Sequence, residues 1–428
     1  MRVEGNIPGR GFARVEFDQD RISSVTMLGS DEASSPVLSP GLVDLQLNGF
    51  AGIDFSRPDL EPEEAVSVLP HVWKTGVTSF CPTLITNSRD RLLRSFRVLE
   101  VARKLDRGFA ASVPCYHLEG PYFDPGEARG VHDPSLMRPA DWDEFVELQQ
   151  AAGGNIGIVT LAPEVPGALD FIARARAAGV VAAIGHTMAE PELVHKAAEA
   201  GATLSTHLGN GCPQKIDRHT SPLWAQLVCD QLSASLICDT FHLPPDVVKV
   251  IVRAKGIERC ILITDATHAA TLAPGRYTVV GTEIELLPNG KVIRADGGSL
   301  GGSALSMNRA VPLFMRLAGV PLAGALRTAT FNPARLLHRP GVCAELAPGE
   351  PANLLVAQPQ AEFLQVEALY LHGELQSFGM AEPAARNSEI GRGGRIRTAD
   401  YASAGKIASQ KQGSRRPPHG RSDSHLTK

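Results

Sequence analysis

Short apolar runs recur eight times between residues 43 and 265, and segments with a helical repeat separate them. Several of the runs are almost continuously apolar, which is typical of strands that are buried on both faces of a parallel sheet. A strand followed by a helix, eight times over, predicts a (β/α)8 TIM barrel with right-handed crossovers; an open doubly wound sheet is the alternative. The predicted strands are 43–47, 78–84, 112–119, 157–162, 181–186, 203–208, 233–239 and 260–265.

The segments between these strands carry the start and stop signals of helices. Asn87 and Ser88 are placed to cap a helix, because their side chains can accept a hydrogen bond from its first turn. Pro191 and Gly201 bracket a second helix as its first-turn and C-cap residues. The first of these helices presents one apolar face, made of Leu92, Leu93, Phe96, Leu99 and Ala102.

Segments on both sides of the barrel region alternate between apolar and polar residues in the manner of strands. We expect residues 1–39 and 340–380 to pair into one small β-sandwich domain, so that residues 40–339 form the barrel domain. An insert near 276–293 is typical of a β-hairpin, with its turn at Pro288-Asn289-Gly290.

The composition is that of a soluble globular protein, because 428 residues that are 43% hydrophobic and 21% charged can bury a large core. The net charge of −4 is unevenly placed: residues 381–428 hold 10 Lys/Arg and 4 Asp/Glu, or +6, and the first 380 residues therefore carry −10. An acidic body repels nucleic acid and anionic lipid, so we expect neither as a partner. Any anionic ligand must be held by a few local cations.

The sequence contains no run of 18 apolar residues and no N-terminal signal pattern. Its seven cysteines include no CxxC pair, which argues against a disulfide framework and against a structural zinc knuckle. We therefore expect a cytoplasmic protein without a membrane anchor.

Residues 381–428 are rich in Gly, Ser, Arg and Lys and have only scattered apolar residues, which predicts a disordered basic tail. The string Gly391-Arg-Gly-Gly-Arg-Ile-Arg-Thr-Ala-Asp resembles a peptide produced by read-through into a neighbouring transfer-RNA gene. The alternative function is that of an arm that binds nucleic acid.

Polar and ionisable residues fall repeatedly at the carboxyl ends of the predicted strands, which is the edge where barrel enzymes keep their active sites. A single residue of this kind is most often structural, but several at one rim favour a catalytic site. They are Gln46, Asn48, Glu119, His186, His207, His242 and Asp265.

Glu119, His186 and His207 supply one carboxylate and two imidazoles. Three protein ligands with an open position for water are the arrangement of a catalytic zinc or a similar ion. Asp265 ends the eighth predicted strand, next to the first in a closed barrel. It could therefore act as the general base that takes a proton from the attacking water and passes it to a leaving amine.

These strand ends belong to longer motifs: Pro40-Gly-Leu-Val-Asp-Leu-Gln-Leu-Asn-Gly, His117-Leu-Glu-Gly-Pro, Thr160-Leu-Ala-Pro-Glu, Gly185-His186, Thr206-His207-Leu, Thr264-Asp265-Ala, Leu300-Gly-Gly-Ser and Thr330-Phe-Asn-Pro-Ala. In this order, over about 340 residues, they resemble the N-acetylglucosamine-6-phosphate deacetylase family of the amidohydrolase superfamily. The resemblance implies a barrel that carries a β-sandwich built from both chain ends. It also implies Glu119, His186 and His207 as metal ligands and Asp265 as the catalytic acid/base.

Many amidohydrolases bind a second metal through a His-x-His pair on the first strand, and Gln46 and Asn48 stand at those positions here. Neutral amides are poor zinc ligands. The sequence is therefore similar to the single-metal members, and we expect one divalent ion per subunit: zinc, or else iron, cobalt or manganese. Hydrogen bonding to the barrel floor is a compatible role for the two amides.

The resemblance also implies a set of contacts to a sugar phosphate: His132, Asn210, Gly211, Arg218, Asp239, His242, Leu300, Gly301 and Gly302. In related enzymes a second subunit often completes the phosphate pocket, so a homodimer is implied. Lys215, Arg218 and His219 form a basic cluster that would suit a phosphate, although a surface arginine paired with a neighbouring carboxylate is the alternative.

The departures from the family pattern are concentrated in this region. His207-Leu-Gly-Asn-Gly-Cys stands where the family usually has His-Leu-Tyr-Asn-Ala-Met, and Arg218 is followed by His-Thr-Ser-Pro instead of Glu-Pro-Gly. The metal site is therefore better specified by the sequence than the phosphate site.

The leading hypothesis is metal-dependent hydrolysis of the acetamide of N-acetyl-D-glucosamine 6-phosphate, an amino-sugar phosphate, to D-glucosamine 6-phosphate and acetate, in amino-sugar catabolism or recycling. One alternative is deacylation of another N-acyl amine, such as an unphosphorylated N-acetyl sugar. An alternative of another class is a barrel that binds a ligand without turnover; the presence of all four site residues disfavours it.

The tail gives a first testable prediction. A chain that ends at Met380 should keep the thermal midpoint of unfolding and the enzymatic rate of the full chain, because the removed residues cannot bury enough surface to fold. Parallel melting curves and rate assays check this. A large loss in either measurement would show that the tail is part of the folded protein.

Overall fold

Eight parallel strands form one sheet, in the order β5 (Leu42–Leu47), β8 (Val77–Ile85), β9 (Tyr116–Glu119), β10 (Ile156–Leu161), β11 (Val181–Ile184), β12 (Leu204–Ser205), β13 (Ser233–Ile237) and β14 (Cys260–Ile263). The computed structural model describes residues 1–279, 281–296 and 299–378. A bridge between Leu47 and Ala266 joins the two outer strands and closes the barrel. All nine residues of β8 are buried, as expected for a strand covered on both faces.

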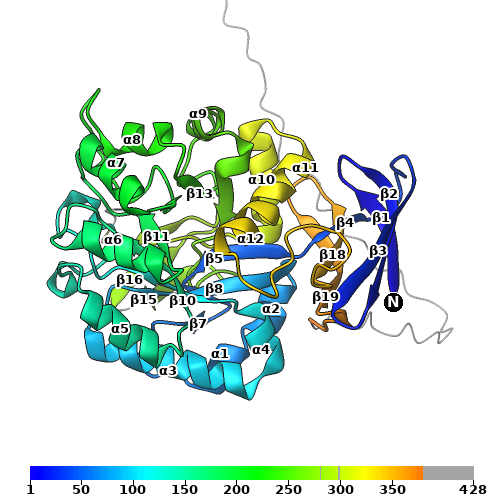
Figure 1. Ribbon diagram of the computed structural model, residues 1–428, viewed down its shortest axis with the longest axis horizontal. Helices are drawn as coiled ribbons and strands as arrows, with labels where there is room; N and C mark the ends of the chain where they lie inside the picture. The colour runs from blue at the N-terminus through cyan, green and yellow to red at the C-terminus, as the bar shows by residue number, and fades with distance from the viewer. Residues whose placement is uncertain (280, 297–298, 379–428) are drawn as a thin grey trace, which may run out of the picture. The chain divides into compact units, whose positions relative to one another are not determined.

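The helices surround this sheet (Figure 1). Ser88 accepts a hydrogen bond from the Arg91 N–H and caps α3, and the predicted apolar face of this helix packs into the core. Pro191 and Gly201 bracket α7, as predicted. The barrel helices are α1 (Pro62–Val66), α2 (Leu69–Trp73), α3 (Arg89–Leu105), α4 (Arg107–Ser112), α5 (Trp142–Ala151), α6 (Ala168–Ala177), α7 (Pro191–Ala200), α8 (Pro222–Val228), α9 (Pro245–Lys255), α10 (Met307–Ala318), α11 (Leu322–Thr328) and α12 (Phe331–Leu337).

The third strand is shorter than the predicted segment 112–119. Helix α4 occupies residues up to Ser112, because Asp106 caps it by accepting a hydrogen bond from the Phe109 N–H at 2.7 Å and Phe109 is buried in the core. Tertiary burial of this aromatic ring therefore extends helical structure into a segment whose composition alone favours a strand.

The two ends of the described chain form a second sheet, in which the early strands and the late strands lie side by side (Figure 1). Strand β4 is the link, because it pairs with β1 and with β18. The ring of Phe17 packs edge-on against Tyr370, 5.2 Å away. The order in the sheet is β20 (Glu374–Leu375), β19 (Leu364–Leu371), β18 (Leu354–Pro359), β4 (Val37–Pro40), β1 (Arg2–Ile7), β2 (Gly11–Asp18) and β3 (Arg21–Gly29).

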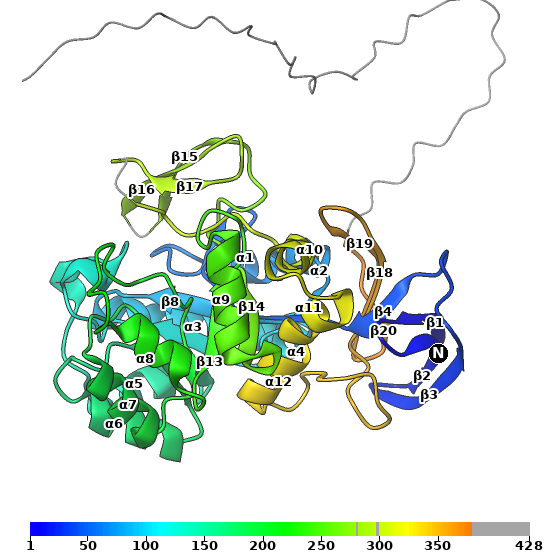
Figure 2. The ribbon, with the colours of Figure 1, turned by 90° about the horizontal axis from the view of Figure 1, so that it is seen from above.

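A small three-stranded sheet stands apart from the barrel sheet in Figure 2. It consists of β15 (Gly275–Val279), β16 (Thr282–Leu286) and β17 (Val292–Arg294). The turn around Pro288-Asn289-Gly290 joins β16 to β17, and β15 adds a third strand to the predicted hairpin. Two-residue strands β6 (Gly49–Phe50) and β7 (Ile53–Asp54) form a further ribbon after β5.

The architecture confirms the predicted fold class, a TIM barrel with a β-sandwich domain from both chain ends. The domain limits at 39/40 and 339/340 stay predictions, and β4 runs across the first of them. The predicted tail, 381–428, lies outside the described residues. Within the described part of the chain, no helix is both long and apolar enough to span a bilayer.

Candidate active site

Four ionisable side chains meet beyond the carboxyl ends of the barrel strands. Glu119 is the last residue of β9, while His186, His207 and Asp265 each follow their strand by two residues. These three have positive φ angles of 50°, 32° and 49°, a conformation that is unusual for residues other than glycine. Such strain is kept only where the surrounding structure enforces it, and it concentrates at functional sites.

Glu119, His186 and His207 form a cluster that fits a metal ion. The Glu119 Oε1 lies 3.3 Å from His186 Nε2 and 3.0 Å from His207 Nε2, and all three side chains are buried. Ligand atoms about 2.0–2.2 Å from a tetrahedral ion are themselves separated by about 3.3–3.6 Å, so these separations need little adjustment. His186 Nδ1 donates to the Ala128 carbonyl at 2.9 Å, so Nε2, which faces Glu119, is the nitrogen that would bind a metal once its proton is lost.

The protonation of the cluster follows from its burial. Burial alone would raise the pKa of Glu119, but hydrogen bonds from His186 and His207 bring it well below its ordinary value. Burial opposes protonation of His207, yet the hydrogen bond and charge of Glu119 raise its pKa overall. Glu119 is therefore an anionic carboxylate that attracts cationic partners, as the binding of a divalent ion requires.

Gln46 and Asn48 contact the carboxylates as hydrogen-bond donors. Gln46 Nε2 donates to Glu119 Oε1 and to Asp265 Oδ1, both at 3.0 Å. Asn48 Nδ2 donates to the same Asp265 oxygen at 2.7 Å. Gln46 thus connects the two acidic side chains, Asn48 adds a second donor to Asp265, and the arrangement agrees with one metal rather than two.

Asp265 is buried beside this cluster. Burial raises its pKa to about 6, and the negative charge of Glu119 adds to the shift. A carboxylate whose pKa lies near neutral pH is suited to exchange protons with a substrate.

His132 lies against the metal-ligand cluster. Its Nδ1 is 2.8 Å from the Thr86 hydroxyl, and its ring packs edge-on against His186 at 4.4 Å and against Phe123 at 4.9 Å. Burial, with the charge of His186, lowers the pKa of His132 to about 3, so the ring is neutral. Thr86 and Phe123 were not among the site residues predicted from the sequence, because no motif marks them.

A cavity of about 500 Å³ opens above these groups. It contains the four strand-end residues and most of the predicted sugar-phosphate contacts. Cys212 and Val279 also line it, although the sequence did not single out either as a contact. The predicted residues on its wall are Asn48, Glu119, His132, His186, His207, Asn210, Gly211, His242, Asp265, Leu300, Gly301 and Gly302.

Arg218 is the exception. It is exposed and lies outside the cavity wall, as do Lys215 and His219, whereas Gln214 and Ile216 on the same loop line the cavity. Asp239 does not line the cavity either, but it holds His242: its Oδ2 accepts from His242 Nδ1 at 2.7 Å.

Gly211 brings the loop after β12 against the metal-ligand cluster. A Cβ atom at this position would lie 3.0 Å from His186 Nδ1 and 3.1 Å from His207 Cε1, and φ is +60°. Glycine, where the family usually has alanine, therefore allows the backbone to approach both imidazoles closely.

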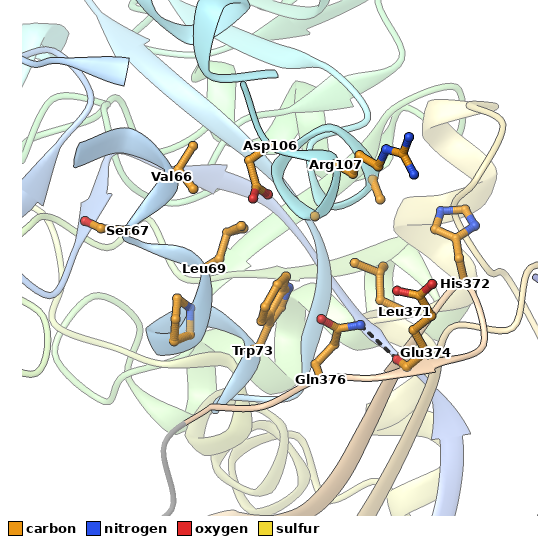
Figure 3. Close-up of a pocket in the computed structure, with 13 residues that line it drawn as sticks. Val66, Ser67, Leu69, Trp73, Asp106, Arg107, Leu371, His372, Glu374 and Gln376 are labelled. Atoms are coloured by element: carbon orange, nitrogen blue, oxygen red, sulfur yellow. Dashed lines mark hydrogen bonds between the residues drawn. The ribbon is translucent and has the colours of Figure 1, made fainter. Parts of the chain in front are cut away.

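A second cavity, of about 570 Å³, lies between α1, α2, α4 and the turn from β19 to β20. Figure 3 shows Trp73, Asp106, Arg107, His372 and Glu374 around it. Among the described residues, Glu119, His186 and His207 are the only group of three side chains able to hold a metal. The first cavity is therefore the candidate active site.

Comparisons with known proteins agree with this assignment, although no protein-family model matches the chain. The chain is 32% identical over 348 residues to the N-acetylgalactosamine-6-phosphate deacetylase of Escherichia coli O157:H7, which covers 81% of this chain and 89% of that protein. It is 32% identical over 352 residues to the N-acetylglucosamine-6-phosphate deacetylase of Bos taurus, covering 79% and 83%.

Solved structures show the same relationship. A mutant N-acetyl-D-glucosamine-6-phosphate deacetylase from Mycobacterium smegmatis, in complex with N-acetyl-D-glucosamine 6-phosphate, superposes with a TM-score of 0.78 at 31% identity, covering 88% of this chain and 98% of that chain. The N-acetylglucosamine-6-phosphate deacetylase of Thermotoga maritima has a TM-score of 0.77 at 26% identity, covering 88% and 99%.

The site geometry predicts the metal content. Purified protein should hold about one divalent ion per chain, because residues 1–279, 281–296 and 299–378 contain one group of three side chains that could hold a metal. Glu119→Gln should lose that ion, since the amide keeps the shape of the side chain but not its charge. Elemental analysis checks both statements. Glu144→Gln, at a buried glutamate paired with Arg138, is the matched control and should keep the ion; two tight ions in the wild type would contradict the assignment.

Proposed function

The chain belongs to the N-acetylglucosamine-6-phosphate deacetylase family of the amidohydrolase superfamily, and on that basis we propose that it hydrolyses N-acetyl-D-glucosamine 6-phosphate to D-glucosamine 6-phosphate and acetate. One observation carries the proposal: a single cavity contains the Glu119, His186 and His207 cluster together with Asp265. Gln46 links the two parts, because its amide donates to both Glu119 and Asp265. A barrel that only bound a ligand would have no need for this combination.

The residues divide the reaction between them. Glu119, His186 and His207 would hold the divalent ion, whose chemistry is to lower the pKa of water and to polarise an amide carbonyl. Of the two carboxylate oxygens of Asp265, Oδ1 accepts hydrogen bonds from Gln46 and Asn48, whereas no described side chain donates to Oδ2. Oδ2 is therefore the oxygen that takes a proton from the attacking water.

Asp265 then delivers this proton to the amide nitrogen as the C–N bond breaks, which leaves acetate and a free amine. Its raised pKa favours the protonated intermediate state of the carboxyl group. His132, fixed by Thr86 through Nδ1, lines the cavity and would position the substrate.

The cavity offers the phosphate fewer contacts than it offers the rest of the substrate. His242, Asn210 and Gly211 line it, but Arg218 is exposed on the neighbouring loop. We propose that the protein is a homodimer in which Arg218 of each chain reaches the cavity of its partner. The exposed apolar side chains of Trp224 and Val228 on α8, directly after this loop, support a protein contact there.

N-acetylgalactosamine 6-phosphate is the second candidate substrate, because one curated relative is named for it at the same identity as those named for the gluco sugar. The two sugars differ only at C4.

An acetate-release assay with both phosphates and with unphosphorylated N-acetylglucosamine tests the proposal. Turnover of a 6-phosphate is expected; preference for the unphosphorylated sugar, or no turnover with an intact metal site, would refute it. The metal's identity and the cytoplasmic location stay predictions.

The role of Asp265 can be tested by a change that keeps its shape. Asp265→Asn removes the proton carrier, and loss of general acid/base catalysis costs about 10² to 10⁴ in rate. The metal content should remain at one ion per chain, since Asp265 is not a member of the metal cluster. Near-normal turnover in this variant would contradict the assignment.

Arg218 tests the phosphate contact. A charge-assisted hydrogen bond contributes roughly 1.5 to 3 kcal/mol, so Arg218→Ala should lower kcat/KM for the 6-phosphate about 10- to 150-fold. The rate with the unphosphorylated sugar should hardly change. Arg97→Ala, at an exposed arginine on α3, is the matched control and should behave as wild type.

Hybrid dimers show whether Arg218 acts in its own chain or in the partner. Co-expressed Arg218→Ala and Asp265→Asn chains should form hybrids with one complete site, and random pairing then restores about a quarter of the wild-type activity. No recovery in the hybrids would show that Arg218 serves its own cavity or none.

A further inference from the structure

The carboxylate of Asp265 is held by hydrogen bonds, and its main chain is strained. Its φ of 49° places it in the left-handed region, which is unfavourable for a residue with a side chain. Because the residue lies two positions beyond β14, the strand does not enforce this conformation by itself. Some other set of bonds must hold it.

We propose that Asp44, Thr264 and Ser303 are positioning residues that clamp the backbone of Asp265, so that its carboxylate stays directed at the metal-ligand cluster. The inference rests on the proposed function, because it assigns these residues to the proton carrier of that reaction. None of the three belongs to the metal cluster, and none lines the cavity.

Asp44 anchors the residue that precedes Asp265. It lies on β5 and is almost completely buried, and its Oδ2 accepts a hydrogen bond from the Thr264 hydroxyl at 2.5 Å. Its Oδ1 accepts from the Thr264 N–H at 3.2 Å. A buried carboxyl group is costly unless it is hydrogen-bonded, so these bonds tie the two outer strands of the barrel together.

The Thr264 hydroxyl also spans Asp265. Besides donating to Asp44, its oxygen accepts the Ala266 N–H at 3.2 Å, so the residues on either side of Asp265 are joined by one side chain. The Asp265 N–H itself donates to the Gln46 carbonyl at 3.0 Å. The same residue, Gln46, thus holds both the backbone and the carboxylate of Asp265.

Ser303 holds the other side of this segment. Its hydroxyl donates to the Thr264 carbonyl at 2.5 Å, and its N–H donates to the Asp265 carbonyl at 3.2 Å. Ser303 directly follows Leu300–Gly302, which line the cavity. The loop predicted to contact the sugar and the backbone of the proton carrier are therefore fixed by the same two hydrogen bonds.

Thr264→Val tests the clamp, because valine keeps the shape of threonine and removes only the hydroxyl. Displacement of a reacting group by about 1 Å can cost on the order of 100-fold, so we expect kcat to fall roughly 10- to 100-fold. KM should stay within about twofold and the metal content at one ion per chain, because the change leaves the cavity wall and the ligands in place. Thr264→Ser, which keeps the hydroxyl, should restore kcat to within about threefold of wild type.

Thr328→Val is the matched control. Thr328 is fully buried on α11 and its hydroxyl donates to the Ala325 carbonyl at 2.7 Å, so the variant loses a comparable hydrogen bond away from the site. It should lower the thermal midpoint without changing kcat. Ser303→Ala offers a second route if Thr264→Val does not fold, and should lower kcat in the same way.

Several outcomes would overturn the inference. A wild-type kcat in Thr264→Val, an equal loss in Thr264→Ser, or loss of the metal would each show that the hydroxyl does not act through Asp265. If the wild type itself releases no acetate, the proposed function is wrong, and crystal structures decide about the clamp. The φ angle of residue 265 should then leave the left-handed region in Thr264→Val and keep it in Thr264→Ser.

Discussion

One carboxylate oxygen, Glu119 Oε1, determines how the site is built. It lies in a buried position where an uncompensated negative charge would be very costly, and it is compensated by Gln46 from β5, His186 from beyond β11 and His207 from beyond β12. These contacts require the strands to be in register around a closed barrel. The positive φ angles after the strands turn the imidazoles toward this oxygen. A divalent ion would compensate the negative charge of Glu119 more completely than these hydrogen bonds do.

The consequences extend from Glu119 to Asp265, the proposed proton carrier. Gln46 donates to both residues, so the carboxylate of the metal-ligand cluster and the carboxylate proposed to exchange the proton are separated by one amide group. A histidine at that position would offer a metal ligand, whereas glutamine offers two donors. On the proposal of one metal ion per chain, this difference explains in physical terms how the barrel keeps two acidic groups close together.

The sequence predicted the barrel, the sheet from both chain ends and the residues at the strand ends, because a period of buried strands and a rim of polar residues are local signals. It could not predict the bonds that connect distant segments. Asp44 meets Thr264 across 220 residues, and Thr86 meets His132 across 46, without any spacing pattern. Nor could it place Arg218, which was expected at the phosphate but lies exposed, since the direction of a loop depends on packing that no periodicity records.

We propose that Glu119, His186 and His207 hold one ion while Gln46 and Asn48 hold none. Anomalous diffraction from crystals of the metal-loaded protein, recorded on both sides of the absorption edge of the bound element, locates every bound ion. We expect one strong peak per chain, within bonding distance of Glu119 Oε1 and the two Nε2 atoms. A peak elsewhere, or a second peak of similar height beside Gln46 and Asn48, would contradict it.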